Sequence, residues 1–411
     1  MTSYNLDPSV SINAVTYDGD TLNGIKVTMG RQSVDEQPRA GYCNVNLITS
    51  GNNGPNINLD DKIEIRLKNS AGLYKLVFSG FVSDINRSFR NFGQSNYVVN
   101  TNVVGVGNLA LLNRRAVGSS NYPQELDGVR IAKILGEAVG ESWSEVDPSL
   151  EWGDVDPTIT WGDYDTGIGD IDNGDYDIVL YNDGPTNAYN LAAQVANSAW
   201  GVLHEKGDGR IYYDDASHRL LNVQNNGYVD FAENVILANT SSLERLADIA
   251  NTVTVNYRNN MSVNGTDAAS ILNYGELSAT VNTLLHDTAA ANAVLDLYLS
   301  TRAEPRRTLN EVTIAPFVDT MTSGQLDAAV EVYCGMPVQI ENVPNSIYGG
   351  AFLGFVEGWT WDISRVEAFL TMYLTEYALS VLAQNWSQVN VNETWATVSP
   401  TLDWANAQVV A

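Results

Sequence analysis

The sequence predicts an α+β protein that is mainly β, in which two β-barrel or β-sandwich domains flank an α+β insert domain. Three observations predict this class. The pattern Phe-x-Gly-Phe-Val occurs twice, at 78–82 and at 352–356. Alternating apolar and polar residues, bounded by Gly, Asn and Asp, surround both copies and are typical of antiparallel strands. Apolar residues at helical spacing are concentrated between the two strand-rich regions.

The similarity between the two copies extends to their flanks. An alternating strand precedes each copy, and its apolar anchor lies 17 positions before the glycine in the first copy (Ile63 to Gly80) and 16 in the second (Val338 to Gly354). A mid-strand glycine also marks a bulge or a close backbone approach in many β-proteins. Because the flanks match as well as the core, we interpret the pattern as one β-domain used twice.

The first β-domain is predicted over 1–115. Clusters of Gly, Asn and Pro separate its strands, and a short apolar piece, Leu109–Leu112, closes it. The strands are expected at Ile25–Met29, Gly41–Ile48, Lys62–Leu67, Tyr74–Val82 and Tyr97–Val104.

The α+β insert domain is predicted over 116–228. Apolar residues at helical spacing predict one helix around Ile131–Ala138 and a clearer one within 185–201. A hairpin is expected next, with Val202–His204 and Arg210–Tyr213 joined by a Gly-rich turn.

The second β-domain is predicted over 229–380, with a C-terminal arm over 381–411. We expect an alternating strand at Thr252–Tyr257 to open this domain and a helix capped by Asp287 to pack against it. The arm is polar, which favours an extended docking segment over a core element. Its tryptophans are Trp386, Trp395 and Trp404.

Length and composition indicate a globular chain. At 411 residues the expected number of domains is two to four, and 44% hydrophobic residues are ample for sizeable cores. The sequence has no apolar run of about 18 residues and no basic, apolar leader. We therefore expect synthesis in the cytoplasm and no membrane-spanning segment.

The sequence contains no motif for catalysis or metal binding. Cys43 and Cys334 are expected to be buried small hydrophobes rather than a disulfide pair. His204, His218 and His286 share no metal-ligand spacing, and no zinc-site, P-loop or nucleophile-elbow pattern occurs. We predict a protein that is not an enzyme, with no catalytic residues, no cofactor and no metal ligands.

The net charge of −27, from 49 acidic and 22 basic residues, argues against tight binding of nucleic-acid phosphates. An acidic wall repels a polyanion and would let it slide past. The same acidity also keeps an Asn-rich surface soluble, and composition alone leaves both interpretations open.

An acidic stretch contains four Gly-Asp-x-Asp units. Such carboxylates on a Gly-rich loop suit calcium, but the uneven spacing favours a solvated surface loop over Asp154–Asp177. Trp152 and Trp161 open two of the units and are either platforms for a sugar ring or buried anchors. With so many Asp residues, the sequence nominates no acid and base pair for glycoside hydrolysis.

The order of these elements resembles that of the baseplate hub proteins of tailed bacteriophages, often called minor tail proteins. The likeness covers about 380 residues in order and depends on the succession of elements, not on a single motif. The matching segments are Gly30–Val82, Asn251–Val255 and Gly335–Gly358, with Ala192–Ala196, Trp200–Gly201 and Gly209–Tyr212 between them.

The resemblance implies two β-domains that are similar to the tail tube subunit and a ring of three chains. Such a homotrimer presents six similar positions and can cap a hexameric tube. The implied partners are the tail tube or distal tail protein and the tip, spike or fibre proteins, with DNA passing through the lumen. The implied location is the tail tip of the virion, after synthesis in the host cytoplasm.

Two other functions remain open from the sequence. The first is a hexameric distal tail ring protein with a carbohydrate-binding insert for host adsorption. The second, with less support, is a glycan-active enzyme. The chain lacks a recognisable peptidase or lysozyme domain, in contrast to some members of the hub family.

Overall fold

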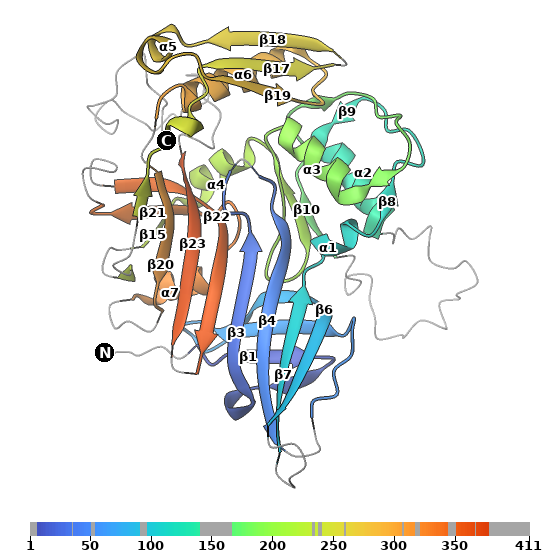
Figure 1. Cartoon of the computed structure of the whole chain (residues 1–411), viewed down its shortest axis with the longest axis vertical. Coiled ribbons are helices and arrows are strands. Elements are labelled where there is room, and N and C mark those ends of the chain that lie inside the picture. Colours follow the sequence, from blue (N-terminus) through green and yellow to red (C-terminus); the bar gives the residue numbers. More distant parts are fainter. Residues whose placement is uncertain are drawn as a thin grey trace.

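The computed structural model describes residues 6–34, 36–50, 54–90, 97–139, 167–231, 235–236, 241–258, 260–305, 308–316, 321–343, 351–365 and 367–377. Over these residues the protein is mainly β with additional helices, as the sequence predicts. Figure 1 shows a broad sheet of long strands, helices beside one end of it, and a small unit of strands and helices above.

One 13-stranded sheet contains the strands of both predicted β-domains. The first half contributes β1 (Ser9–Ile12), β2 (Val15–Tyr17), β3 (Leu22–Gly30), β4 (Arg39–Ser50), β5 (Lys62–Lys68), β6 (Tyr74–Arg90) and β7 (Val98–Val106). The second half contributes β15 (Val229–Asp230), β16 (Ser241–Leu243), β20 (Thr308–Ile314), β21 (Pro337–Glu341), β22 (Ala351–Ser364) and β23 (Ala368–Glu376), with the helix α7 (Ser323–Val330).

The two halves join edge to edge. Strand β22 pairs antiparallel with β3, from Gly358 opposite Gly30 to Ser364 opposite Gly24. None of the sheets formed by the described residues closes on itself. The two halves are thus parts of one open sheet, whereas the sequence suggested two separate barrels or sandwiches.

The same strand connectivity occurs twice in this sheet. In the first half the order is β3-β4-β7-β6-β5, and each neighbouring pair is antiparallel. In the second half the order is β16-β20-β23-β22-β21, again antiparallel throughout. The apolar anchors identified in the sequence pair directly with the repeated glycines, Ile63 with Gly80 and Val338 with Gly354.

The repeated glycines are required by close packing. A Cβ atom at Gly80 would lie 2.2 Å from the carbonyl oxygen of Val106, and one at Gly354 would lie 2.2 Å from that of Thr375. At both positions the ring of the phenylalanine two residues earlier also lies within 3.1 Å of the added atom. Any side chain would therefore displace either the neighbouring strand or the buried ring.

The two copies share a bulge and a left-handed turn. The register of β6 against β7 shifts just after Val82, and that of β22 against β23 just after Val356. Ahead of each copy a residue with positive φ, Asp60 (69°) or Gly335 (84°), donates its N–H to the carbonyl oxygen of Val82 or Val356 respectively. Bulges bend strands locally, so both copies turn at the same point.

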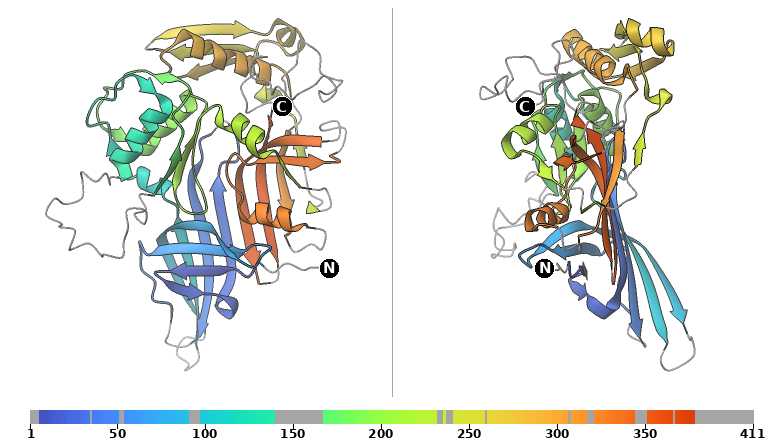
Figure 2. Two further views of the ribbon diagram at one scale, coloured as in Figure 1. Left: turned by 180° about the vertical axis from the view of Figure 1, so that it is seen from behind. Right: turned by 90° about the vertical axis from the view of Figure 1, so that its left-hand side faces the viewer.

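A continuous hydrophobic core lies under both halves. It includes Ile63 and Phe78 from the first half and Phe352 and Trp361 from the second, all fully buried. Helix α7 covers one face of the sheet in the second half and adds the buried Leu326 (Figure 2). Cys43 and Cys334 are buried free thiols, which confirms the prediction.

The insert lies between the halves in sequence and packs beside the sheet. Its two longer helices, α2 and α3, bury the apolar stripes predicted from the sequence, and β13 and β14 form the predicted hairpin. Its elements are α1 (Leu109–Leu112), β8 (Ala116–Val117), β9 (Glu125–Leu126), α2 (Asp127–Val139), β10 (Ile168–Ile171), β11 (Asp177–Ile178), β12 (Thr186–Asn187), α3 (Ala188–Ser198), β13 (Val202–Glu205), β14 (Ile211–Asp214) and α4 (His218–Asn226).

A separate small sheet follows the insert. It has the order β18-β17-β19, and α6 packs on it. Its elements are β17 (Thr252–Tyr257), β18 (Met261–Thr266), α5 (Ala268–Tyr274), β19 (Ser278–Asn282) and α6 (Thr288–Arg302). Val253, Val255 and Val294 share a hydrophobic core with the insert and not with the large sheet.

This arrangement differs from the expectation that Thr252–Tyr257 and the helix after Asp287 belong to the second β-domain. The alternating pattern correctly marks a strand, but it does not say which sheet the strand joins. The domain boundaries at 115, 228 and 380 remain predictions, and the arm over 381–411 lies outside the described residues.

Candidate functional site at the junction of the sheet and the insert

Glu357 connects the three main parts of the fold. It lies at the bulge of β22, and its side chain is fully buried. Arg31, directly after β3, donates from Nε to Glu357 Oε2 over 2.6 Å. Arg219, on α4 of the insert, donates from Nη1 to Oε1 over 2.6 Å and from Nη2 to Oε2 over 2.8 Å. One carboxylate thus joins the first half, the second half and the insert.

The charge of Glu357 is held by its two partners. Burial alone would raise the pKa of Glu357, but the Arg219 and Arg31 guanidinium groups outweigh burial and lower the pKa to about 2. A bidentate arginine pair is among the strongest charge-assisted contacts. Two cations share one anion, so this buried cluster carries a net positive charge within a chain of net charge −27.

A second buried carboxylate, Glu205 of β13, links the insert to the first half. It accepts hydrogen bonds from the backbone N–H groups of Gly41 and Leu109, the latter over 2.9 Å. Gly41 and Gly107 leave room for it, since a Cβ atom at either would overlap the carboxylate. Burial raises the pKa of Glu205 to about 7, even though the backbone N–H groups favour the charged form.

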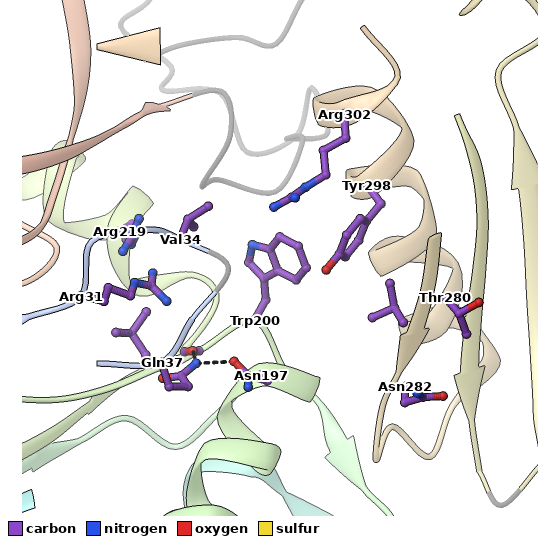
Figure 3. Close-up of a pocket in the computed structure, with 13 residues that line it drawn as sticks. Arg31, Val34, Gln37, Asn197, Trp200, Arg219, Thr280, Asn282, Tyr298 and Arg302 are labelled. Atoms are coloured by element: carbon purple, nitrogen blue, oxygen red, sulfur yellow. Dashed lines mark hydrogen bonds between the residues drawn. The ribbon is translucent and has the colours of Figure 1, made fainter. Parts of the chain in front are cut away.

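Beside Glu357 is a pocket of about 350 Å³. Figure 3 shows Trp200 near its centre, with Tyr298 and Arg302 extending toward it from α6 and with Arg31 and Arg219 on the opposite side. The rings of Trp200 and Tyr298 meet edge to face, with centroids 5.1 Å apart. The pocket is therefore bounded by the first half of the sheet, the insert and the small sheet-and-helix unit.

Trp200 has an unusual backbone conformation for its residue type. It follows α3 with φ at 61°, and the N–H of Gly201 donates to the carbonyl oxygen of Ala196 over 2.9 Å. This is the usual left-handed end of a helix, in which glycine is the favoured residue. Here the glycine stands one position later, at 201, where packing requires it: a Cβ atom there would lie 2.2 Å from the hydroxyl of Tyr213. A tryptophan in a left-handed conformation marks the position as a candidate functional residue.

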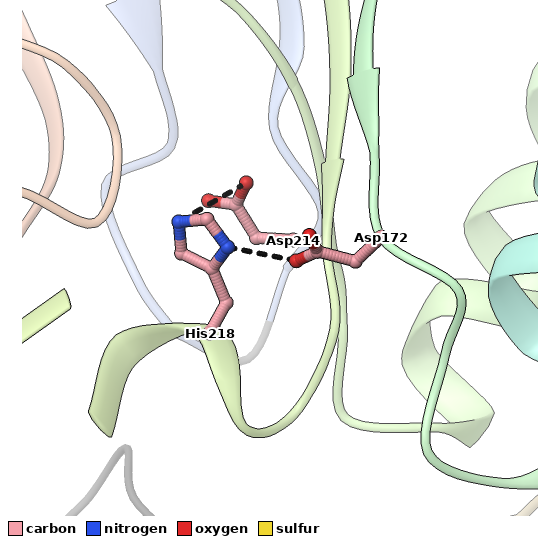
Figure 4. Close-up of side chains that lie close together, drawn as sticks. All are labelled: Asp172, Asp214 and His218. Atoms are coloured by element: carbon pink, nitrogen blue, oxygen red, sulfur yellow. Dashed lines mark hydrogen bonds and ion pairs between the residues drawn. The ribbon is translucent and has the colours of Figure 1, made fainter. Parts of the chain in front are cut away.

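A histidine lies between two carboxylates on the insert. His218 Nδ1 is 2.7 Å from Asp172 Oδ2, and its Nε2 is 3.7 Å from Asp214 Oδ1. Figure 4 shows Asp172, directly after β10, and Asp214, at the end of β14, on either side of the His218 ring at the start of α4. Hydrogen bonding to Asp172 is the main cause that raises the pKa of His218. Both ring nitrogens face a carboxylate oxygen, which favours the protonated imidazolium. The three side chains also offer ligand atoms within 4.8 Å of one another, so they are the described residues that could hold a metal ion.

Comparison with solved structures identifies the fold. The chain is similar to a 43 kDa tail protein of prophage MuSo2 from Shewanella oneidensis, with a TM-score of 0.59 and 11% identity over 91% of this chain and 99% of that chain. It is also similar to a tail protein from Neisseria meningitidis MC58, with a TM-score of 0.59 and 10% identity over 92% of this chain and 98% of that chain. The chain has the fold of phage tail proteins.

The resemblance inferred from the order of elements is thereby confirmed at the level of the fold. No family model matches the sequence, and no curated protein matches it. At such low identity the tail-protein fold is similar while individual side chains differ, so the site residues above must be judged from this chain's own geometry. Among the described residues, no helix of the tail-protein fold is long and apolar enough to cross a membrane.

The described part of the acidic stretch lies at the surface, where Asp170 and Asp175 are exposed. Asp172 accepts the backbone N–H of Asp215 over 3.1 Å, and Asp175 accepts that of Ser217 over 2.9 Å, so this part is tied to the turn before α4. The residues before 167, including Trp152 and Trp161, lie outside the described residues.

Sequence reasoning missed the junction residues. Arg31, Arg219 and Glu205 carry no local motif, because their partners are distant in the chain. One feature of the sequence could have indicated Glu357. It directly follows the second repeated motif, at the position that Ser83 occupies after the first copy, so the two copies differ there by a charged side chain. The three histidines share no spacing, and only folding places His218 beside Asp172 and Asp214.

Proposed function

We propose that the chain is a structural hub protein of a phage tail tip or baseplate. In this proposal three copies form a ring with pseudo-sixfold symmetry, which joins the hexameric tail tube to the tip and lets DNA pass. The observation that carries the proposal is the strand connectivity that occurs twice within one sheet. A threefold ring of such chains presents six similar units to a sixfold partner.

The junction at Glu357 supports the same role. A ring that mimics sixfold geometry needs its two units held at a fixed angle, and a rigid connection achieves this better than a flexible linker. The β22–β3 pairing and the buried Arg31, Arg219 and Glu357 cluster provide such a connection. The fold shared with two phage tail proteins also supports a structural role in a tail, without enzymatic activity.

The net charge of −27 supports passage of DNA through the ring. Acidic walls repel the phosphate backbone and prevent it from adhering. The proposed partners are further copies of this chain, the tail tube or distal tail protein, and the proteins of the tip, with the virion tail tip as the location.

Imaging of the assembled tail by electron cryomicroscopy tests this proposal. The expected result is a ring of three copies at the tube end, with both halves of each chain at the same radius. Six copies per ring would instead favour a distal tail ring protein with a carbohydrate-binding insert. Halves at different radii would contradict the symmetry-matching mechanism.

A further inference from the structure

The pocket around Trp200 is lined by basic and aromatic side chains, and two of its arginines, Arg31 and Arg219, share the buried Glu357 carboxylate. Its lining includes the three arginines Arg31, Arg219 and Arg302 and has no Asp or Glu, although acidic residues outnumber basic ones 49 to 22 in the whole sequence. The Arg302 guanidinium also lies over the Tyr298 ring, 5.0 Å from its centroid. Aromatic faces beside cations favour an occupant with aromatic and acidic side chains.

The described chain ends next to this pocket. Tyr377 follows β23, and its ring stacks on Phe355 with centroids 5.7 Å apart. On the same phenylalanine ring lies the Arg219 guanidinium, 5.1 Å from the centroid. Arg219 in turn lines the pocket. One aromatic ring therefore separates the last described residue from a pocket residue.

The 34 residues that follow, 378–411, have the matching chemistry. They contain three tryptophans and the acidic residues Glu393 and Asp403, and they contain no Lys, Arg or His. An extended chain spans about 3.3 Å per residue, so the nine residues from Tyr377 to Trp386 reach about 30 Å. Every tryptophan of the segment is therefore within reach of Trp200.

We propose that residues 378–411 dock onto this pocket of their own chain. A tryptophan of the segment packs against Trp200 and Tyr298, in a pocket whose lining contains no acidic residue that would repel Glu393 or Asp403. The left-handed backbone of Trp200 is then explained by function, since a glycine there would relieve the strain but remove the aromatic surface. This proposal does not depend on the proposed role in a phage tail.

Amide hydrogen exchange of the full-length protein, measured by mass spectrometry over 378–411, tests the proposal. We expect the segment to exchange at least tenfold more slowly in the wild type than in Trp200→Gly or Arg302→Glu. Trp200→Gly places the preferred residue at a helix end, and Arg302→Glu leaves Trp200 and its packing in place, so the two variants change the pocket independently. The control is Arg114→Glu, an exposed arginine away from the pocket, which should leave exchange unchanged.

A double-variant comparison identifies the docking residue. Replacing one of Trp386, Trp395 and Trp404 by Ala should accelerate exchange as much as Trp200→Gly does, and combining the two should add no further increase. Two results would overturn the proposal: wild-type exchange over 378–411 as fast as in an unstructured peptide, or slow exchange that the pocket variants do not change. Protection that disappears on dilution would assign the occupant to a neighbouring copy and overturn the same-chain assignment.

Discussion

Gly354 occupies in the second half of the sheet the position that Gly80 occupies in the first. Each pairs with the apolar anchor of the preceding strand and lies under the ring of the phenylalanine two residues earlier. Each is followed, two residues later, by the start of a bulge. The two positions are therefore equivalent in sequence, register and packing.

Substitution of either glycine by alanine should damage the fold to a similar extent. The added Cβ atom would lie 2.2 Å from a backbone oxygen in both cases, so strands must shift. We expect Gly80→Ala and Gly354→Ala each to lower the free energy of unfolding by about 2–4 kcal/mol, measured by chemical denaturation.

Gly136→Ala is the matched control. Gly136 is exposed on α2, and an added Cβ atom there would meet nothing within 4 Å. We expect this change to stabilise the protein by about 0.5–1 kcal/mol through helix propensity. Loss of stability in only one of the two sheet variants would argue against equivalent roles.

Removing the charge of Glu357 should destabilise the junction. Glu357→Gln leaves the buried Arg31 and Arg219 guanidinium groups without their anion, and we expect a loss of about 3–5 kcal/mol in the free energy of unfolding. The control Glu64→Gln alters a partly exposed carboxylate that pairs with Arg66 and Lys62, and it should cost about 1 kcal/mol or less. Equal losses of unfolding free energy in the two variants would show that the buried Glu357 pairs stabilise the fold no more than a partly exposed ion pair does.

Acidification should weaken the same junction. The folded-state pKa of Glu357 is lowered to about 2 from an ordinary value of 4.5, so its contribution is present above pH 4.5 and is lost as the pH falls toward 2. The wild type should therefore lose more stability than Glu357→Gln over this window. Parallel curves for the two proteins in acid denaturation would contradict the lowered pKa.

Glu205 should make the protein less stable as the pH rises, which is the opposite of the effect of Glu357. The folded-state pKa of Glu205 is raised from 4.5 to about 7, so the unfolded chain releases this proton first as the pH rises. The wild type should then lose stability between pH 4.5 and 7 relative to Glu205→Gln, by an amount on the order of 3 kcal/mol. Denaturation at several pH values checks this, and a constant difference between the two proteins would refute it.

His218 should titrate above the ordinary value of 6.5 because Asp172 and Asp214 favour its protonated form. Nuclear magnetic resonance of the imidazole protons measures this pKa directly, with His218→Gln assigning the signal. Asp172→Asn should move the pKa back toward 6.5, since the main hydrogen-bond partner loses its charge. No change in the Asp172→Asn variant would show that the contact does not control the titration.

Local patterns in the sequence predicted most of the long strands of the large sheet, the helices α2 and α3 and the repeated glycine motif. They did so because alternation and helical spacing depend on neighbours along the chain. The merging of both halves into one sheet was not predictable in this way, since β22 pairs with β3 across more than 300 residues. The shared contact of Arg31 and Arg219 with Glu357 was not predictable either, because these three residues are far apart in the sequence.

The mass of the purified native assembly tests the central proposal most directly. Native mass spectrometry should give three times the chain mass of 44.8 kDa, because one chain supplies two of the six similar units. An assembly of six chains, or a chain that remains monomeric at assembly concentrations, would contradict the trimeric hub.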